Sequence, residues 1–167
     1  TQCDIRRCYP SISHEKLRGY LKRDLHKSHE LLYMFMTFIE LYEEFPNPES
    51  KDTMRGILIG SPVSKDLCNY FLSYAYHYAS EKLVKISTRR GKTREKRLIS
   101  HVIFYADDIV LFSGNKKDVH MAQRMLIEYM NKILDLDIKP NWKMTKAMYE
   151  DRNGKARGSL LDYMGFR

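Results

Sequence analysis

The sequence has no long apolar run. No stretch of its 167 residues approaches the about eighteen uncharged apolar residues that a membrane-spanning helix needs, so we expect no membrane partner. It also has few cysteines. Cys3, Cys8 and Cys68 are odd in number and lack the spacing of metal ligands. This disfavours a disulfide framework and a structural zinc site, and it favours a reducing, cytoplasmic location.

Internal repeats and low-complexity segments are also absent from the sequence. Its residues are 43% hydrophobic and 12% aromatic, a composition that excludes an intrinsically disordered chain. Lys and Arg number 29 against 21 Asp and Glu, a net charge of +8, which favours a polyanionic partner such as nucleic acid. The length suits a single domain. Because Thr1 is not an initiator methionine and both ends read as strands, we expect a fragment of a longer protein.

Hydrophobic periodicity predicts a chain of mixed strands and helices. We expect helices around 17–25, 31–42, 61–78 and 119–133, and strands over 1–6, 99–105, 109–112, 136–144 (broken by Pro140) and 160–166. Residues 85–97 hold seven basic side chains and one acid, which predicts an exposed turn or hairpin arm. Without the inserted helices the order is β-α-β-β-α-β. This predicts an α+β fold with a ferredoxin-like antiparallel sheet and helices on one face.

Three carboxylates should converge on one edge of that sheet. Asp4 lies on the first strand, which this fold places beside the central hairpin, and Asp107 and Asp108 lie at the hairpin tip. Such a cluster repels itself unless cations neutralise it. Oxygen ligands suit Mg²⁺, and two ions about 3.5–4 Å apart can clamp the attacking and leaving oxygens of phosphoryl transfer. The alternative is that Asp107 and Asp108 form a polar turn and Asp4 caps a strand.

Four segments resemble motifs of reverse transcriptases, in the order of that family. Residues 104–112, Phe-Tyr-Ala-Asp-Asp-Ile-Val-Leu-Phe, resemble the catalytic Tyr-x-Asp-Asp box between apolar strands. Residues 4–12 are similar to the first palm motif of bacterial members, in which an aromatic residue follows the Asp by five positions. Residues 56–69 resemble the motif Gly-x-Pro-x-Gly-x-x-x-Ser-x-x-Leu-x-Asn. Residues 161–166 are similar to the segment that closes the palm and begins the primer grip.

The resemblance implies an RNA-directed DNA polymerase that adds deoxynucleotides to a primer 3′-hydroxyl with two Mg²⁺ ions, for which Mn²⁺ can substitute. Its partners would be an RNA template, a DNA primer and deoxynucleoside triphosphates. Residues 1–167 would form the palm, with the start of the fingers and the thumb outside this chain, so we expect the isolated fragment to be inactive. The alternatives are a defence-type (abortive-infection) reverse transcriptase with untemplated synthesis, and a non-catalytic nucleic-acid-binding palm.

The subfamily stays open. Leu58 replaces the Pro of the second motif, and Ile59 stands where many members have Gln. An Ile at this position is similar to the reverse transcriptases of diversity-generating retroelements. Ser61 and Pro62 look more like retron and group II intron enzymes.

The resemblance also implies site residues. Asp4, Asp107 and Asp108 are catalytic, and with the Ile5 carbonyl they hold the metals. Around the incoming nucleotide it places seven residues: Arg7, Cys8, Tyr9, Ile59, Gly60, Ser64 and Asn69. Tyr9 would be the aromatic gate that a 2′-hydroxyl strikes, with a core tyrosine as the alternative. Ser64 is equally well explained as a helix N-cap.

Basic side chains complete the expected site. We expect the exposed arm to contact phosphates through Arg89, Arg90, Arg94 and Arg97. A lysine near the leaving pyrophosphate would act as general acid. Because Trp142 stands where the family often has this lysine, the choice among Lys139, Lys143 and Lys146 is open.

Overall fold

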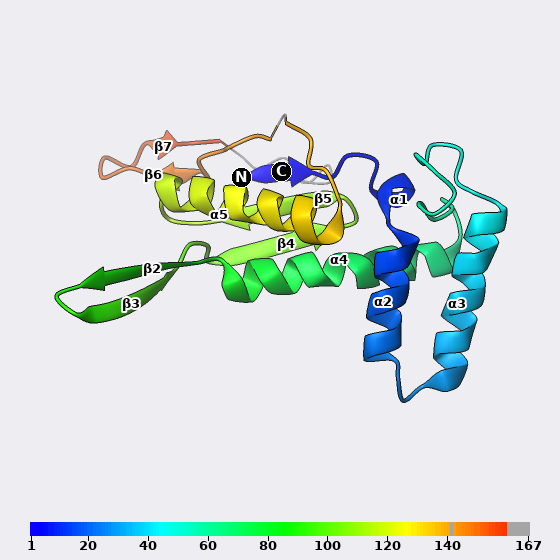
Figure 1. The fold of residues 1–167 in the computed structure, drawn as a ribbon. Helices are drawn as coiled ribbons and strands as arrows, with labels where there is room; N and C mark the ends of the chain where they lie inside the picture. The colour runs from blue at the N-terminus through cyan, green and yellow to red at the C-terminus, as the bar shows by residue number, and fades with distance from the viewer. Residues whose placement is uncertain (141, 160–167) are drawn as a thin grey trace.

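The computed structural model describes residues 1–140 and 142–159. Its elements are, in chain order, β1 (Gln2–Asp4), α1 (Cys8–Ser11), α2 (His14–Asp24), α3 (His29–Glu44), α4 (Pro62–Lys82), β2 (Val84–Arg89), β3 (Lys92–Arg97), β4 (His101–Tyr105), β5 (Asp108–Phe112), α5 (Lys116–Tyr129), the π-helical η1 (Met130–Leu134), β6 (Tyr149–Glu150) and β7 (Ala156–Arg157). This content confirms an α+β fold (Figure 1). The strand expected over 160–166, with the resemblance at 161–166, lies outside the described residues. Within the described part of the chain, no helix is long and apolar enough to cross a membrane.

An antiparallel sheet in the order β1-β5-β4 forms the centre of the molecule (Figure 1). The first strand therefore lies beside the central hairpin, as expected. Asp4 is the register partner of Asp108, which in turn pairs with Tyr105 of β4. Ala106 and Asp107 form the turn between β4 and β5, and Ala106 has a positive φ of 48°. Asp108 is thus the first residue of a strand, and the prediction that it lies in the hairpin tip is wrong.

Among the described residues after η1, 135–140 and 142–144, the chain follows the other edge of β1 without forming a regular strand. Isolated antiparallel bridges join Ile138 to Ile5 and Lys143 to Gln2. Pro140 lies between the bridges and has no amide hydrogen with which to continue the ladder. In the part of 136–144 that the structure describes, the expected strand is therefore reduced to two bridges.

Helices α4 and α5 cover one face of the sheet. α4 packs against β4, α5 packs against β5, and the two helices contact each other. Tyr78 of α4 stacks on Tyr129 of α5 with ring centroids 4.0 Å apart. Between the helices and the sheet lies the core, whose largest fully buried side chains include Phe71, Ile109, Leu111 and Leu126. The opposite face of the sheet is open at Ile103 and Tyr105, which are both exposed.

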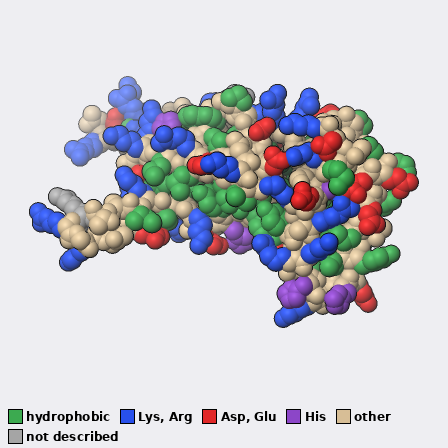
Figure 2. Space-filling view, in the orientation of Figure 1, with side chains coloured by type: hydrophobic (Ala, Val, Ile, Leu, Met, Phe, Trp, Pro, Cys, Tyr) green, Lys and Arg blue, Asp and Glu red, His purple; other side chains and the backbone are tan. Residues whose placement is uncertain are grey.

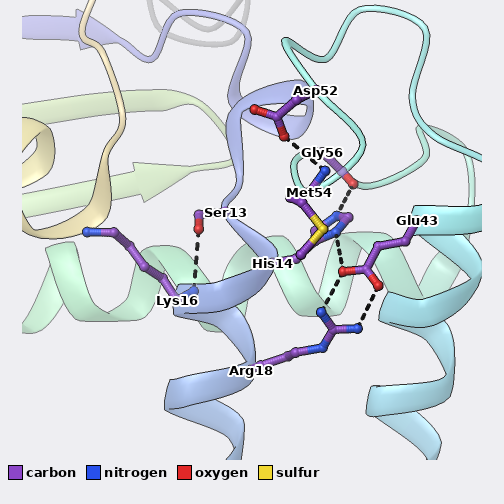
Figure 3. A network of polar contacts seen from close by, with 8 residues as sticks. All are labelled: Ser13, His14, Lys16, Arg18, Glu43, Asp52, Met54 and Gly56. Carbon is purple, nitrogen blue, oxygen red and sulfur yellow. Dashed lines mark hydrogen bonds and ion pairs between the residues drawn. The ribbon is translucent and has the colours of Figure 1, made fainter.

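Helices α2 and α3 form a helical hairpin that projects from one end of the molecule (Figure 1). A polar network ties it to the loop before α4 (Figure 3). His14 is fully buried, with Nε2 2.6 Å from the Gly56 carbonyl oxygen and Nδ1 3.3 Å from Glu43 Oε1. Arg18 donates to the other oxygen of Glu43 at 2.9 Å. The network thereby fixes the start of the loop that carries the second motif.

Gly56 occupies a place that other residues do not fit. Its φ is +87°, and an added Cβ would collide with Ser50 and lie 3.1 Å from the Pro10 carbonyl oxygen. Its amide donates to the Ile12 carbonyl at 2.8 Å. The loop before α4 is thereby held against the segment that follows β1.

Strands β2 and β3 form a hairpin that projects from the opposite end of the molecule (Figure 1). Its turn consists of Arg90 and Gly91, both at positive φ, the conformation that two-residue hairpin loops favour. At its base, Arg97 donates to the Ser80 carbonyl of α4. The exposed arm expected over 85–97 is thus confirmed as a hairpin. β6 and β7 form a shorter second hairpin at the same end.

Candidate active site

Asp4 ends β1, and its two carboxylate oxygens differ in their surroundings. Oδ2 accepts a hydrogen bond from Lys139 Nζ at 2.7 Å. Oδ1 is buried and has no hydrogen-bond partner among the described residues. A buried polar atom without a partner costs free energy, so a native structure that retains one needs a reason for it. Oδ1 is therefore free to contact a cation that the chain itself does not supply.

Asp107 and Asp108 bring two further carboxylates to the same edge of the sheet. Asp108 lies opposite Asp4, and like charges in this position repel. The Ile5 amide donates to the Asp107 carbonyl at 2.9 Å, which fixes the turn against the end of β1. Burial raises the pKa of Asp108, and the negative charges of Asp107 and Asp4 raise it further. The three carboxylates predicted from the sequence are thus brought together.

Lys139 supplies the positive charge nearest to this cluster. Its hydrogen bond to Asp4 raises the pKa of its ammonium group, which therefore stays protonated. Lys146 instead donates to the Tyr149 hydroxyl at 2.9 Å, and Lys143 pairs through its backbone with Gln2. Of the three lysines considered for the general acid, Lys139 is the one whose described contacts reach a carboxylate. Across residues 1–140 and 142–159, no three His, Cys, Asp or Glu side chains are close enough to enclose a metal ion.

The backbone after β1 turns sharply at Arg7. Its φ of 48° and ψ of 55° are left-handed, a conformation that is uncommon for a residue other than glycine. The turn starts α1 and buries the Cys8 side chain, whose Sγ lies 3.7 Å from Cys68 Sγ. Among the described hydrogen bonds, the amides of Arg7 and Cys8 donate to no acceptor. Cys8 can therefore contact a ligand through its backbone amide but not through its buried side chain.

A cavity of about 420 Å³ opens beside the hairpin turn. It is lined by Tyr9, by Asn69 and Tyr76 of α4, and by Tyr105 and Ala106 at the end of β4. Two predicted nucleotide contacts, Tyr9 and Asn69, therefore share one cavity next to Asp107. Sequence analysis missed Tyr76, although it follows Asn69 by seven residues and so lies on the same face of a helix.

The remaining predicted nucleotide contacts lie elsewhere. Ser64 is fully buried inside α4, and its hydroxyl is 2.8 Å from the Tyr42 hydroxyl. The N-cap of α4 is Ser61, so the alternative of Ser64 as a helix cap is wrong. Ile59 is 70% exposed in the turn before α4, and Gly60 beside it has a φ of +95° with open space around its Cα. Nucleotide contacts by Ser64, Ile59 and Gly60 stay predictions.

The four arginines expected to bind nucleic acid belong to the β2–β3 hairpin, at the other end of the sheet. Arg90 and Arg94 are exposed. The Arg97 guanidinium anchors the hairpin to α4, whereas Arg89 ends β2. The five residues of β4 lie between this hairpin and the Asp107 turn, a length of about 16 Å. The structure therefore does not bring these arginines to the carboxylates.

Comparison with known proteins identifies the family of the chain. No curated protein matches the chain. A family model described as "Reverse transcriptase (RNA-dependent DNA polymerase)" matches residues 1–167, the full length of the sequence. The chain therefore belongs to the reverse transcriptase family.

Proposed function

We propose that this chain is the palm of an RNA-directed DNA polymerase, which transfers deoxynucleotides to a primer 3′-hydroxyl on an RNA template. The observation that carries the proposal is the register of Asp4 opposite Asp108, with Asp107 in the adjoining turn. The family match supports this activity in general. The bridges at Ile138 and Lys143 lie at one edge of β1, and β5 and β4 follow at its other edge. This is the strand order of a ferredoxin-like sheet, which supports the assignment as a palm.

The carboxylate edge has the ligand chemistry for divalent metal ions, although its three side chains do not enclose a metal position in the described structure. Asp4 Oδ1 is buried without a partner among the described residues, and carboxylate oxygens are the ligands that Mg²⁺ prefers. Asp4, Asp107 and Asp108 would hold two Mg²⁺ or Mn²⁺ ions. The Ile5 carbonyl, which accepts none of the described hydrogen bonds, would complete the ligand set. When bound, the ions activate the primer hydroxyl and neutralise the charge that develops on the leaving pyrophosphate.

The chain's own groups would position the nucleotide around this edge. The ring of Tyr9 lines the 420 Å³ cavity, where it would exclude a 2′-hydroxyl. The free amides of Arg7 and Cys8 form a turn that suits the triphosphate as a backbone anion nest. A second cavity, of about 270 Å³, adjoins that turn and is lined by Arg6, Arg7, Lys51 and Arg55, together with Ser11, Asp135 and Asp137. These cations would attract the polyphosphate end of the nucleotide.

Lys139 is the general acid in this proposal. Its ammonium group lies 2.7 Å from Asp4 Oδ2 and keeps its proton at the edge of the carboxylate cluster. When Asp4 no longer holds it, Lys139 Nζ can turn to the pyrophosphate oxygen. It would donate a proton there as the anhydride bond between the α- and β-phosphates breaks and the new ester bond to the primer oxygen forms.

A non-catalytic palm is the weaker candidate. A module that only binds nucleic acid gains nothing from three clustered carboxylates, which repel each other and the phosphate backbone. A defence-type enzyme that polymerises without a template would use the same carboxylates, so the fold supports it equally.

Primer extension separates the three candidates. The intact protein is incubated with a DNA primer, deoxynucleoside triphosphates and Mg²⁺, with and without an annealed RNA template, and with a chelator as control. Incorporation that follows the template sequence and stops with the chelator is the expected result. Incorporation without a template would assign the defence-type activity. RNA binding without any incorporation would assign a non-catalytic palm.

A further inference from the structure

The positive charge of the chain is concentrated at one end. Residues 84–97, 116–118 and 143–157 contain fourteen Lys and Arg against four Asp and Glu. The rest of the chain contains fifteen basic and seventeen acidic residues. These three segments comprise the β2–β3 hairpin, the start of α5 and the region of the β6–β7 hairpin, and we call them the basic end. Figure 1 shows both hairpins at this end, and Lys and Arg gather there in Figure 2. The net charge of +8 therefore arises there.

The β2–β3 hairpin carries its charge on one face. Side chains alternate along a strand, and the register pairs Lys85 with Lys96 and Ser87 with Arg94. Lys92 lies on this same face, two residues before Arg94. The other face holds Val84, Ile86, Thr88, Thr93, Glu95 and Arg97, and the hydroxyls of Thr88 and Thr93 meet there at 3.4 Å. Lysines directly opposite each other repel, so a polyanion lying across the basic face would relieve a cost that the free hairpin bears.

The basic face is oriented by an ion pair at its base. Lys96 donates to Asp118, in the first turn of α5, at 2.5 Å. This ion pair turns the base of the basic face toward the start of α5, the end of the molecule at which Figure 1 shows both hairpins. Lys116 and Lys117 are exposed at the start of this helix. Exposed Arg and Lys side chains also follow β6, at positions 152 and 155.

We propose that the basic end binds the sugar–phosphate backbone of a folded RNA stem outside the candidate active site. Residues 84–97 contain no Phe, Tyr or Trp, so the arm has no platform on which unpaired bases stack. Phosphates of a double helix have a regular spacing that lysines and arginines on two hairpins can follow without reading the sequence. The proposal rests on the proposed function in one respect, which is that the template RNA supplies the stem.

The distance from the carboxylates separates this surface from the primer terminus. β4 alone adds about 16 Å between the hairpin base and the Asp107 turn. A stem bound at the basic end would therefore hold the template on the enzyme while the single-stranded part reaches the carboxylate edge. Binding at this end should need neither a primer nor a nucleotide.

The test is binding of a labelled RNA stem-loop, without primer, to the intact protein over a series of salt concentrations. The test variant combines Lys85→Gln, Lys92→Gln and Arg94→Gln, which leaves the anchors Lys96 and Arg97 in place. The slope is that of the logarithm of the binding constant against the logarithm of the salt concentration. Each lost phosphate contact lowers its magnitude by about 0.9, so the loss of three contacts lowers it by roughly 2.7. The same loss should weaken binding by at least about tenfold at low salt. The charge-preserving variant Lys85→Arg, Lys92→Arg, Arg94→Lys should keep the wild-type slope.

Three controls make the outcome decisive. Lys22→Gln, Lys27→Gln and Lys132→Gln together remove the same charge from exposed positions outside the basic end, and they should change the slope much less. A DNA stem-loop of equal length tests whether the surface distinguishes RNA from DNA. The RNA stem-loop should bind more tightly, because the surface is proposed to follow the phosphates of an A-form RNA stem. Asp107→Asn should retain stem binding even though it removes polymerisation, which separates failure of this proposal from failure of the proposed function.

An unchanged slope in the arm variant would overturn the proposal, and so would an equal loss in the control triple. Binding of the arm to phosphatidylserine vesicles in preference to both stem-loops would also overturn it.

Discussion

Asp4 and Asp108 are cross-strand register partners, and Lys139 contacts Asp4 from the opposite edge of β1. Two carboxylates in this position repel each other and lower the stability of the sheet. One lysine offsets part of this cost through a single oxygen of Asp4. The pKa of Asp108 is raised by burial and by its acidic neighbours. The local arrangement therefore lowers the stability of the free protein, a cost that the proposed metal ions would offset.

Asp108→Asn should stabilise the protein in the absence of divalent metal. Because the folded-state pKa of Asp108 lies above its usual 3.8, the charged carboxylate destabilises the fold, and this cost appears as pH rises above 3.8. We expect a gain of up to about 1 kcal/mol at pH 7 and none below pH 3.8, where both states are protonated. Urea unfolding at pH 7 and at a pH below 3.8 measures the change in the free energy of unfolding, with Asp66→Asn as the exposed control. An equal gain at both pH values would disprove the repulsion.

Lys139→Met should strengthen metal binding and slow catalysis. A unit positive charge about 4 Å from a divalent cation in water opposes it by about 2 kcal/mol, so Mn²⁺ affinity should rise roughly thirtyfold without it. Primer extension should fall, because the leaving pyrophosphate loses its proton donor. Electron paramagnetic resonance of Mn²⁺ measures the affinity, and Lys143→Met is the matched control. Unchanged Mn²⁺ affinity would show that Lys139 does not face the metal site.

Tyr9→Val should relax sugar selection. Removing the ring opens the 420 Å³ cavity at the position where a 2′-hydroxyl would collide. We expect the ratio of kcat/KM for a deoxynucleotide over its ribonucleotide to fall by about 10-fold to 100-fold. Tyr33→Val, at an exposed position of α3, is the control. An unchanged ratio would mean that Tyr9 is a core residue without contact to the sugar.

His14→Leu should destabilise the protein by about 1–3 kcal/mol, since the buried Gly56 carbonyl loses the donor that lies 2.6 Å away. Thermal unfolding measures the effect, and His29→Leu, at an exposed position at the start of α3, is the control. If both variants unfolded at the same temperature, the network in Figure 3 would contribute nothing to stability.

Sequence reasoning succeeded where the signal is local. Apolar spacing predicted α2, α3, α4 and α5, and two β-rich runs around Asp107 predicted the β4–β5 hairpin. The position of Asp4 beside this hairpin followed from a general rule of β-α-β-β-α-β folds. The family resemblance supplied the functional interpretation, which spacing alone left open.

Sequence reasoning failed where contacts between distant side chains, or strain in the backbone, determine the local structure. The left-handed turn at Arg7 and the short helix α1 were not predicted, because Pro10 reads as a breaker although a helix tolerates proline in its first turn. The contact between Lys139 and Asp4 joins residues 135 positions apart, and only the bridged segment beside β1 brings them together. Asp108 was assigned to the turn because the sequence does not reveal which residue resumes the pairing.

The most direct test of the account is primer extension on an RNA template by the intact protein carrying Asp107→Asn. The account predicts that the rate falls at least about a hundredfold, because a carboxylate that would hold the metal ions is lost, while circular dichroism and RNA affinity stay unchanged. Asp66→Asn, which neutralises an exposed carboxylate on α4, should extend the primer at the wild-type rate. Extension by Asp107→Asn at a rate near that of the wild type would contradict the two-metal polymerase mechanism proposed for Asp4, Asp107 and Asp108.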